Sequence, residues 1–108
     1  MLLVENIICG GLYKLHAKIL SKFKQCIREN RYVVTLHAEE EIDEDELSIF
    51  DVESAILTGV IIERQKDSTK GEWKYIIRGH AIDSSVVAIV SKLSLTDKMV
   101  IITVYRDE

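Results

Sequence analysis

The sequence predicts an α+β fold, and two observations carry that prediction. Before Gly59 the apolar residues recur at steps of three and four, which is the spacing of one buried helix face. After Gly59 the chain divides into four apolar, β-branched runs joined by short turn-forming connections, as in neighbouring antiparallel strands. We therefore expect an N-terminal helix, a short strand and two short helices, followed by a four-stranded antiparallel meander with the helices on one face.

The N-terminal helix is predicted over residues 12–30, which carry an apolar stripe on one face and lysines on another. The stripe comprises Leu12, Leu15, Ile19, Phe23, Cys26 and Ile27. Cys26 and Cys9 are the only cysteines, and neither stands in a metal-binding spacing. We therefore expect two core or near-core thiols, with no metal and no cofactor.

The next segment predicts a strand and two short helices. Residues 32–36, YVVTL, have strand character, and the chain turns helical at His37. The second short helix has the clearest start in the sequence, because Ser48 can cap it and Asp51 can complete a capping box. Gly59 ends this helix.

Four strands are predicted after Gly59, and their alternation predicts a cationic patch. The strands are expected at residues 60–66, 72–79, 85–93 and 98–106. The last two are almost entirely apolar, which places them at the centre of the sheet. Alternation puts Lys74, Arg78 and His80 on one face of the second strand. We expect Arg64, on the first strand, to join them in the patch.

Length and charge bound the range of functions. The 108 residues predict a single domain, 1–108, with an N-terminal extension at 1–31 and a core at 32–106. The net charge is −4, and nine acids without one Lys or Arg lie between residues 37 and 53. This balance argues against strong generic nucleic-acid binding. No apolar run approaches the ~18 residues that span a bilayer, so we expect a cytoplasmic protein with no membrane association.

Three motifs resemble those of one family. They are T-x-H-A-x-E at 35–40, S-I-x-D-V-E-x-A-I-L-x-G at 48–59 and I-I-T-V-Y at 101–105. The pattern resembles a widespread domain-of-unknown-function family of small bacterial and archaeal proteins, over residues 32–106. That family is distantly similar to the RelE and BrnT toxins, small ribonucleases of toxin–antitoxin systems with a β-α-α-β-β-β core.

The resemblance implies a metal-independent endoribonuclease that acts on RNA and has an antitoxin as its protein partner. It implies His37 as general acid or base, with Arg78 and Tyr105 beside it at the catalytic site. Arg64, Lys74 and His80 would then bind RNA. Many relatives carry arginines just after the H-A pair, where this chain has acids at 39–46. Since phosphate binding needs cations, we expect the ribonuclease activity to be weak or lost.

A second hypothesis is a non-catalytic domain that binds a protein partner or forms a homodimer, with the acidic stretch as its recognition surface. Under that hypothesis His37 caps or orients the turn between strand and helix. The strand bases would be exposed charges that discourage edge-to-edge pairing. The arrangement of His37 relative to Arg64, Lys74, Arg78 and Tyr105 is the observation that separates the two hypotheses.

Overall fold

Four antiparallel strands follow Gly59, as the change of period predicts. The structure is a computed structural model that describes residues 16–67 and 69–107. The strands are β2 (Val60–Lys66), β3 (Trp73–His80), β4 (Val86–Leu93) and β5 (Met99–Arg106). Each pairs antiparallel with the next in the chain, so the predicted meander is confirmed.

A fifth strand, which the predicted meander does not include, completes the sheet. β1 (Tyr32–Val34) pairs in parallel with β5, and the strand order is β1-β5-β4-β3-β2. Tyr32 lies opposite Met99 and Val34 opposite Ile101. β4 and β5 are therefore inner strands, as their apolar sequences predict.

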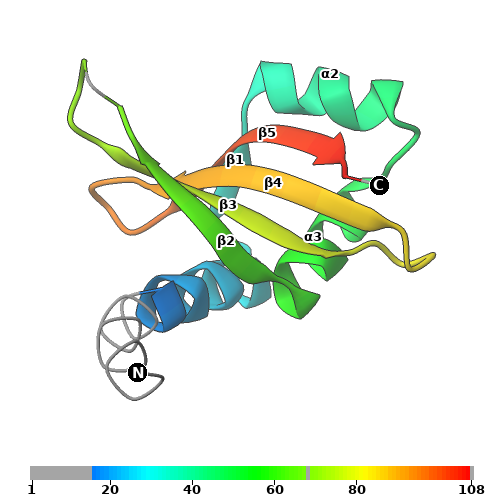
Figure 1. The fold of residues 1–108 in the computed structure, drawn as a ribbon, viewed down its shortest axis with the longest axis horizontal. Coiled ribbons are helices and arrows are strands. Elements are labelled where there is room, and N and C mark those ends of the chain that lie inside the picture. The colour runs from blue at the N-terminus through cyan, green and yellow to red at the C-terminus, as the bar shows by residue number, and fades with distance from the viewer. Residues whose placement is uncertain (1–15, 68, 108) are drawn as a thin grey trace, which may run out of the picture.

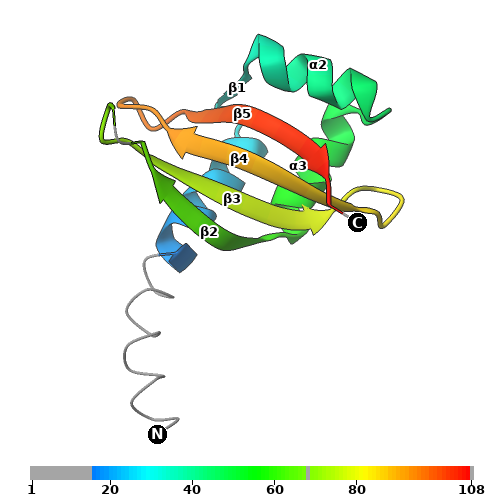
Figure 2. The ribbon, with the colours of Figure 1, turned by 45° about the horizontal axis from the view of Figure 1, so that its top comes forward.

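The helices form one layer behind the sheet and one cover along its edge. Figure 2 shows the helix at residues 16–28 and α3 (Ile49–Thr58) behind the sheet, whose front face the described residues leave open. Figure 1 shows α2 (Leu36–Glu44) running along β5 instead. The prediction that the helices pack on one face is right for the N-terminal helix and α3, and wrong for α2.

The core lies between the sheet and the two helices behind it. Its fully buried side chains include Phe23, Val52, Ile56, Ile77, Ile89, Met99 and Ile101. Phe23 meets Tyr75 edge to face at 5.8 Å between ring centroids, which seats the N-terminal helix on β3. Cys26 is buried in this core, whereas Cys9, Leu12 and Leu15 lie outside the described residues.

Local hydrogen bonds determine where α3 begins, and another connects it to β1. The Ser48 hydroxyl accepts from the Asp51 N–H, and the Asp51 carboxylate accepts from the Ser48 N–H at 2.9 Å, so the predicted capping box is present. The Tyr32 hydroxyl donates to Glu53 at 2.7 Å and ties β1 to α3. Burial, reinforced by this carboxylate, raises the pKa of Tyr32 to about 12.

Candidate functional site

Carboxylates of α2 and of its C-cap residue, Asp45, cover the part of β5 that β1 leaves unpaired. Glu41 accepts a hydrogen bond from the Val104 N–H at 3.0 Å, and Asp45 accepts one from the Arg106 N–H at 3.1 Å. An open strand edge presents such N–H groups to other chains, and a covering element removes that hazard. Two acids of the acidic stretch therefore have a structural role that the sequence pattern does not reveal.

His37 lies on α2 with 66% of its side chain exposed. Its Nε2 atom is 3.3 Å from the Glu41 Oε1 atom, one turn further along the helix. Thr35 is the residue that caps the turn, because its hydroxyl accepts from the Ala38 N–H and donates to the Ile102 carbonyl. The expectation that His37 caps this turn is therefore wrong, and its ring is exposed beside Glu41.

Two of the predicted catalytic residues share one cross-strand row on the open face. Arg78 lies opposite Ala88, and Ala88 lies opposite Tyr105. Directly opposed residues point to the same side of a sheet, so the Arg78 and Tyr105 side chains flank Ala88 two strands apart. Lys74 and His80 share the Arg78 side by alternation along β3, as predicted.

Arg64 lies on the other face of the sheet, so its predicted place in the patch is wrong. A β-bulge between Ile61 and Glu63 inserts one residue and reverses which face the rest of β2 presents. Arg64 therefore lies opposite Tyr75, on the side of the helices. Its guanidinium stacks over the Trp73 ring at 4.2 Å from the centroid.

The bases of the open face are each paired with an acid. Lys74 lies 3.8 Å from Asp67, Arg78 lies 3.1 Å from Asp107, and Lys92 lies 2.7 Å from Glu72. The hydrogen bond from Lys92 lowers the pKa of Glu72, so this carboxylate keeps its charge. Such surface pairs add little stability, but they neutralise the cations that a phosphate would need.

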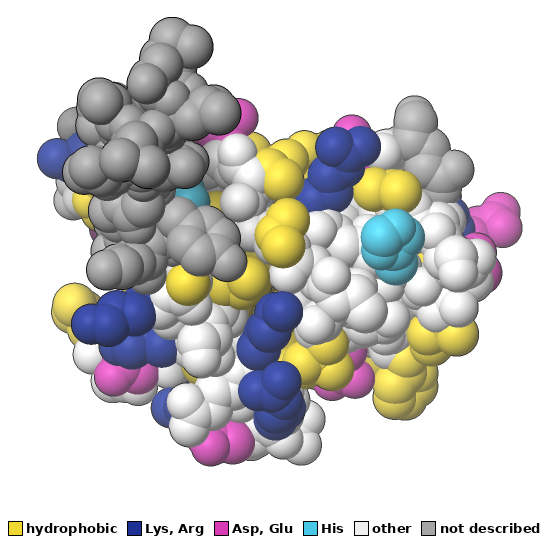
Figure 3. Space-filling model, turned by 60° about the horizontal axis from the view of Figure 1, so that its bottom comes forward, with side chains coloured by type: hydrophobic (Ala, Val, Ile, Leu, Met, Phe, Trp, Pro, Cys, Tyr) yellow, Lys and Arg dark blue, Asp and Glu magenta, His cyan; other side chains and the backbone are white. Residues whose placement is uncertain are grey.

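Free negative charge gathers on α2 and the turn after it. We use the name acidic surface for five exposed carboxylates, those of Glu39, Glu40, Asp43, Glu44 and Glu46. Within residues 16–67 and 69–107 none of the five is in an ion pair. On a different side of the molecule, that of the N-terminal helix, Lys and Arg side chains form several small, separate groups (Figure 3).

A groove borders the acidic surface. It has a volume of about 320 Å³ and lies between β1, α2 and the start of α3. It is lined by Val34, Glu39, Ile42, Asp43, Leu47, Ser48 and Ile49. Apolar side chains thus meet two carboxylates four residues apart on one helix face. The spacing of Glu39 and Asp43 is the sequence signal that could have suggested this groove.

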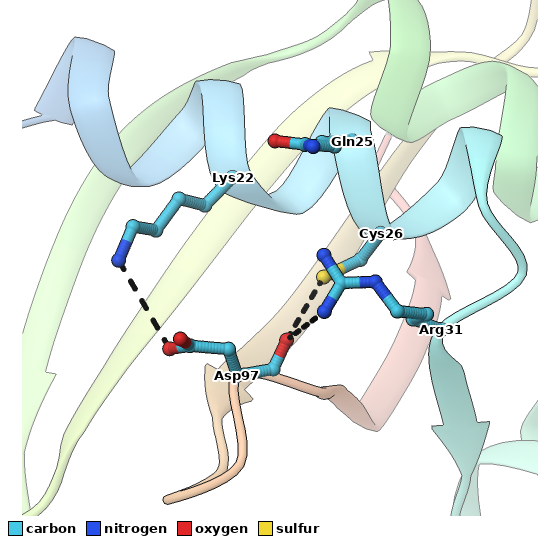
Figure 4. A pocket seen from close by; sticks show the side chains of 5 residues that line it. All are labelled: Lys22, Gln25, Cys26, Arg31 and Asp97. Carbon is cyan, nitrogen blue, oxygen red and sulfur yellow. Dashed lines mark hydrogen bonds and ion pairs between the residues drawn. The ribbon is translucent and has the colours of Figure 1, made fainter.

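Two further hollows hold none of the six predicted site residues. One, of about 610 Å³, lies beside the turn between β4 and β5. The other, of about 150 Å³, lies under the N-terminal helix (Figure 4). There Lys22 reaches the Asp97 carboxylate at 4.0 Å, and both Arg31 and the Cys26 thiol donate to the Asp97 carbonyl. These contacts tie the helix to the turn between β4 and β5.

The described residues also bear on metals and membranes. Among them, no three His, Cys, Asp or Glu side chains are placed to hold a metal ion together. No helix within this part of the chain has the length and apolar character needed to cross a membrane.

Comparison with known proteins places the chain in a family. No curated protein and no solved structure matches it. A family model described as a domain of unknown function (DUF4258) matches residues 34–106. This range holds α2, α3 and all four strands of the meander. The match covers nearly all of the 32–106 region that carries the three motifs. The chain therefore belongs to this family of domains of unknown function, DUF4258.

Proposed function

We propose that this domain acts by binding a basic protein partner through the acidic surface, and that it does not cleave RNA efficiently. The observation that supports the proposal is the contrast in pairing. The five carboxylates of the acidic surface have no cation beside them in the described part of the chain, whereas Lys74, Arg78 and Lys92 are each paired with an acid. The charge available to a partner here is therefore negative.

The same contrast weighs against a phosphate-binding groove on the open face. Cleavage of a phosphodiester needs groups that stabilise the negative charge of the transition state. Arg78 is engaged by Asp107, and the ring of His37 stands beside Glu41 rather than beside a base. An RNA strand on this face would have to break the ion pairs and lie close to α2.

A second candidate is the toxin-like function, in which the open face contacts RNA with weak or lost ribonuclease activity. The row that runs from Arg78 across Ala88 to Tyr105 favours it, since it sets a cation and an aromatic ring on one surface. The exposed ring of His37, on the helix beside β5, could supply the general acid or base. The resemblance to RelE and BrnT toxins belongs to this candidate, with an antitoxin as the partner.

The experiment that tests the first candidate compares three forms of the full chain as bait in source-cell lysate. The forms are the unchanged protein, a neutralised variant and a control. The neutralised variant carries Glu39→Gln, Glu40→Gln, Asp43→Asn, Glu44→Gln and Glu46→Gln. The control carries Glu63→Gln, Asp97→Asn and Asp107→Asn. We expect mass spectrometry to find a protein that the unchanged and control forms retain and the neutralised variant loses. Equal recovery by all three forms would refute the proposal.

An RNA assay on the same proteins tests the second candidate. We expect the unchanged chain to leave single-stranded RNA intact. Cleavage that disappears in Arg78→Ala and His37→Ala, with unchanged melting temperatures, would establish the toxin-like function instead.

A further inference from the structure

The outer edge of β1 has backbone groups without a partner. The Arg31 carbonyl accepts from the Met99 N–H at 3.1 Å, and the Thr35 N–H donates to the Ile101 carbonyl at 3.0 Å. The N–H and C=O of one strand residue point to the same side, and this side alternates along the strand. The backbone groups of Tyr32 and Val34 therefore face away from β5. In the described structure no strand pairs with β1 on that side.

The groove beside the acidic surface adjoins this edge through Val34. Val34 contributes both to the unpaired edge and to the groove lining. The remaining apolar lining includes Ile42 and Leu47, which are nearly buried and belong to the core. A chain that left the edge of β1 would thus pass directly over an apolar floor.

The carboxylates at the rim of the groove favour an occupant with positive charge. Glu39 and Asp43 are both exposed, and neither has a cation beside it among the described residues. They are four residues apart on α2, so they are separated by about 6 Å along the helix axis. Side chains two residues apart in a strand are separated by nearly the same distance. Two Lys or Arg residues at alternate positions of an extended segment match this spacing.

We propose that an extended segment of a partner protein, carrying basic residues at alternate positions, adds to the outer edge of β1. Its backbone pairs with Tyr32 and Val34, two basic side chains on one face of the segment meet Glu39 and Asp43, and their alkyl chains lie over the apolar floor of the groove. Main-chain pairing supplies affinity in this mode of recognition, and the side chains supply specificity. The inference rests on the proposed function and names the partner and the place where it docks.

The test uses a synthetic octapeptide of alternating lysine and valine, capped at both ends, and the full isotopically labelled chain. Calorimetry gives the affinity, and nuclear magnetic resonance gives the amide exchange rates of Tyr32 and Val34. A matched peptide with N-methyl groups at alternate residues keeps the charge but cannot pair along one edge. We expect the unmodified peptide to slow exchange at both amides, and the N-methyl peptide to bind about tenfold more weakly.

Two charge-reversed variants of α2 provide the matched control. One carries Glu39→Lys and Asp43→Lys at the groove, and the other carries Glu40→Lys and Glu44→Lys on the outer side of the same helix. We expect the groove pair to weaken binding by about tenfold and the outer pair by less than about threefold. Glu39→Gln with Asp43→Asn repeats the test without reversed charge, and thermal melting confirms that each variant folds.

The outcomes separate the inference from the proposed function. Equal weakening by both pairs, without protection of Tyr32 and Val34, would overturn the docking site but leave the acidic surface as a binding surface. Unchanged binding in both pairs would overturn both proposals. A failure of the peptide to bind would overturn the docking site, while the proposed function is decided by the lysate experiment. Protection of the same amides in concentrated protein alone would identify a second copy as the occupant and overturn the choice of a separate partner.

Discussion

Two glycines determine how closely α3 approaches β3. A Cβ atom on Gly79 would lie 1.8 Å from the Ala55 carbonyl oxygen, and one on Gly59 would lie 2.5 Å from the same atom. Both distances are far inside van der Waals contact with backbone that cannot move aside. Gly59 has an extended backbone with φ −91°, so it is required here by space and not by a left-handed conformation. The sequence-based interpretation of Gly59 as a helix stop is right about the place and incomplete about the reason.

Gly79→Ala should therefore destabilise the protein by about 2 kcal/mol or more, because overpacking forces α3 away from the sheet. Gly71→Ala is the matched control, since Gly71 has φ +70° and a Cβ atom there would have no other atom within 4 Å. It should cost only about 1 kcal/mol, from backbone strain. Urea denaturation of both variants measures the difference. Equal losses would show that contact with Ala55 does not limit the packing.

Thr35→Ala and His37→Ala should differ in their consequences for stability. Thr35 caps α2 and also bonds the Ile102 carbonyl, so its loss should cost about 1 kcal/mol. His37 is largely exposed and its polar contact among the described residues is with Glu41, so its loss should change stability by less than about 0.5 kcal/mol. Thermal melting of the two variants decides between these roles. A large loss in His37→Ala would restore its structural interpretation.

At the scale of elements, the start of α3 should respond to acid. The backbone N–H of Ser48 holds the pKa of Asp51 below its ordinary value of 3.8, and the Ile82 N–H adds to this. A carboxylate with a lowered pKa stabilises the fold above its unfolded pKa, and this contribution is lost as the pH falls through the folded value. Asp51→Ala should therefore be less stable than the unchanged chain at about pH 6, with the difference shrinking by about pH 2.5. Denaturation curves at both pH values test this, and a constant difference would contradict it.

The cover of α2 over β5 should be measurable by amide exchange. Glu41→Ala with Asp45→Ala removes both side-chain acceptors, so the Val104 and Arg106 amides should exchange faster. Each lost bond should cost about 1 kcal/mol. Glu40→Ala with Glu44→Ala, on the outer side of α2, should leave both amides protected. Unchanged protection in the first variant would show that other contacts hold the helix on the strand.

The elements themselves were predictable because their signals are local. The capping box at Ser48, the change of period at Gly59 and the short turns between strands all lie within a few residues. The bulge in β2 was not predictable from alternation, because alternation assumes that each residue of a strand lies opposite one residue of its neighbour. That single inserted residue moved Arg64 to the other face of the sheet. The parallel pairing of β1 with β5 was equally hidden, since it joins residues far apart in the chain.

For the whole molecule, the distribution of charge predicts poor binding to nucleic acid. The net charge is −4, the bases of the open face are paired with acids, and the carboxylates of the acidic surface have no cation beside them in the described part of the chain. Affinity for DNA and RNA comes largely from neutralised phosphates and the counterions they release. We expect affinities weaker than about micromolar for single-stranded RNA and duplex DNA at physiological salt. A gel-shift titration measures this, and sub-micromolar binding would contradict it.

The candidate site was less predictable than the fold because it depends on which groups meet in space. The sequence shows that Glu39 to Glu46 are acidic, but not that Glu41 and Asp45 are used by β5 while their neighbours stay free. It shows Lys74 and Arg78 on one face, but not that Asp67 and Asp107 reach them. The proposed function therefore rests on the pairing of charges in space, which neither the composition nor the individual site residues reveal.

The cover of α2 over β5 depends on a near match between the repeat of an α-helix and the repeat of a β-strand. Four residues of an α-helix advance about 6 Å, and two residues of a strand advance about 6.8 Å. Glu41 and Asp45 can therefore serve Val104 and Arg106 in succession, as a neighbouring strand would. The mismatch of about 0.8 Å per step would reach about 1.6 Å at a third carboxylate one turn earlier. That position is held by His37, and the strand there bulges at Ile102, whose carbonyl is taken by Thr35. Glu41 and Asp45 thus take the place of a neighbouring strand for two successive hydrogen bonds along β5.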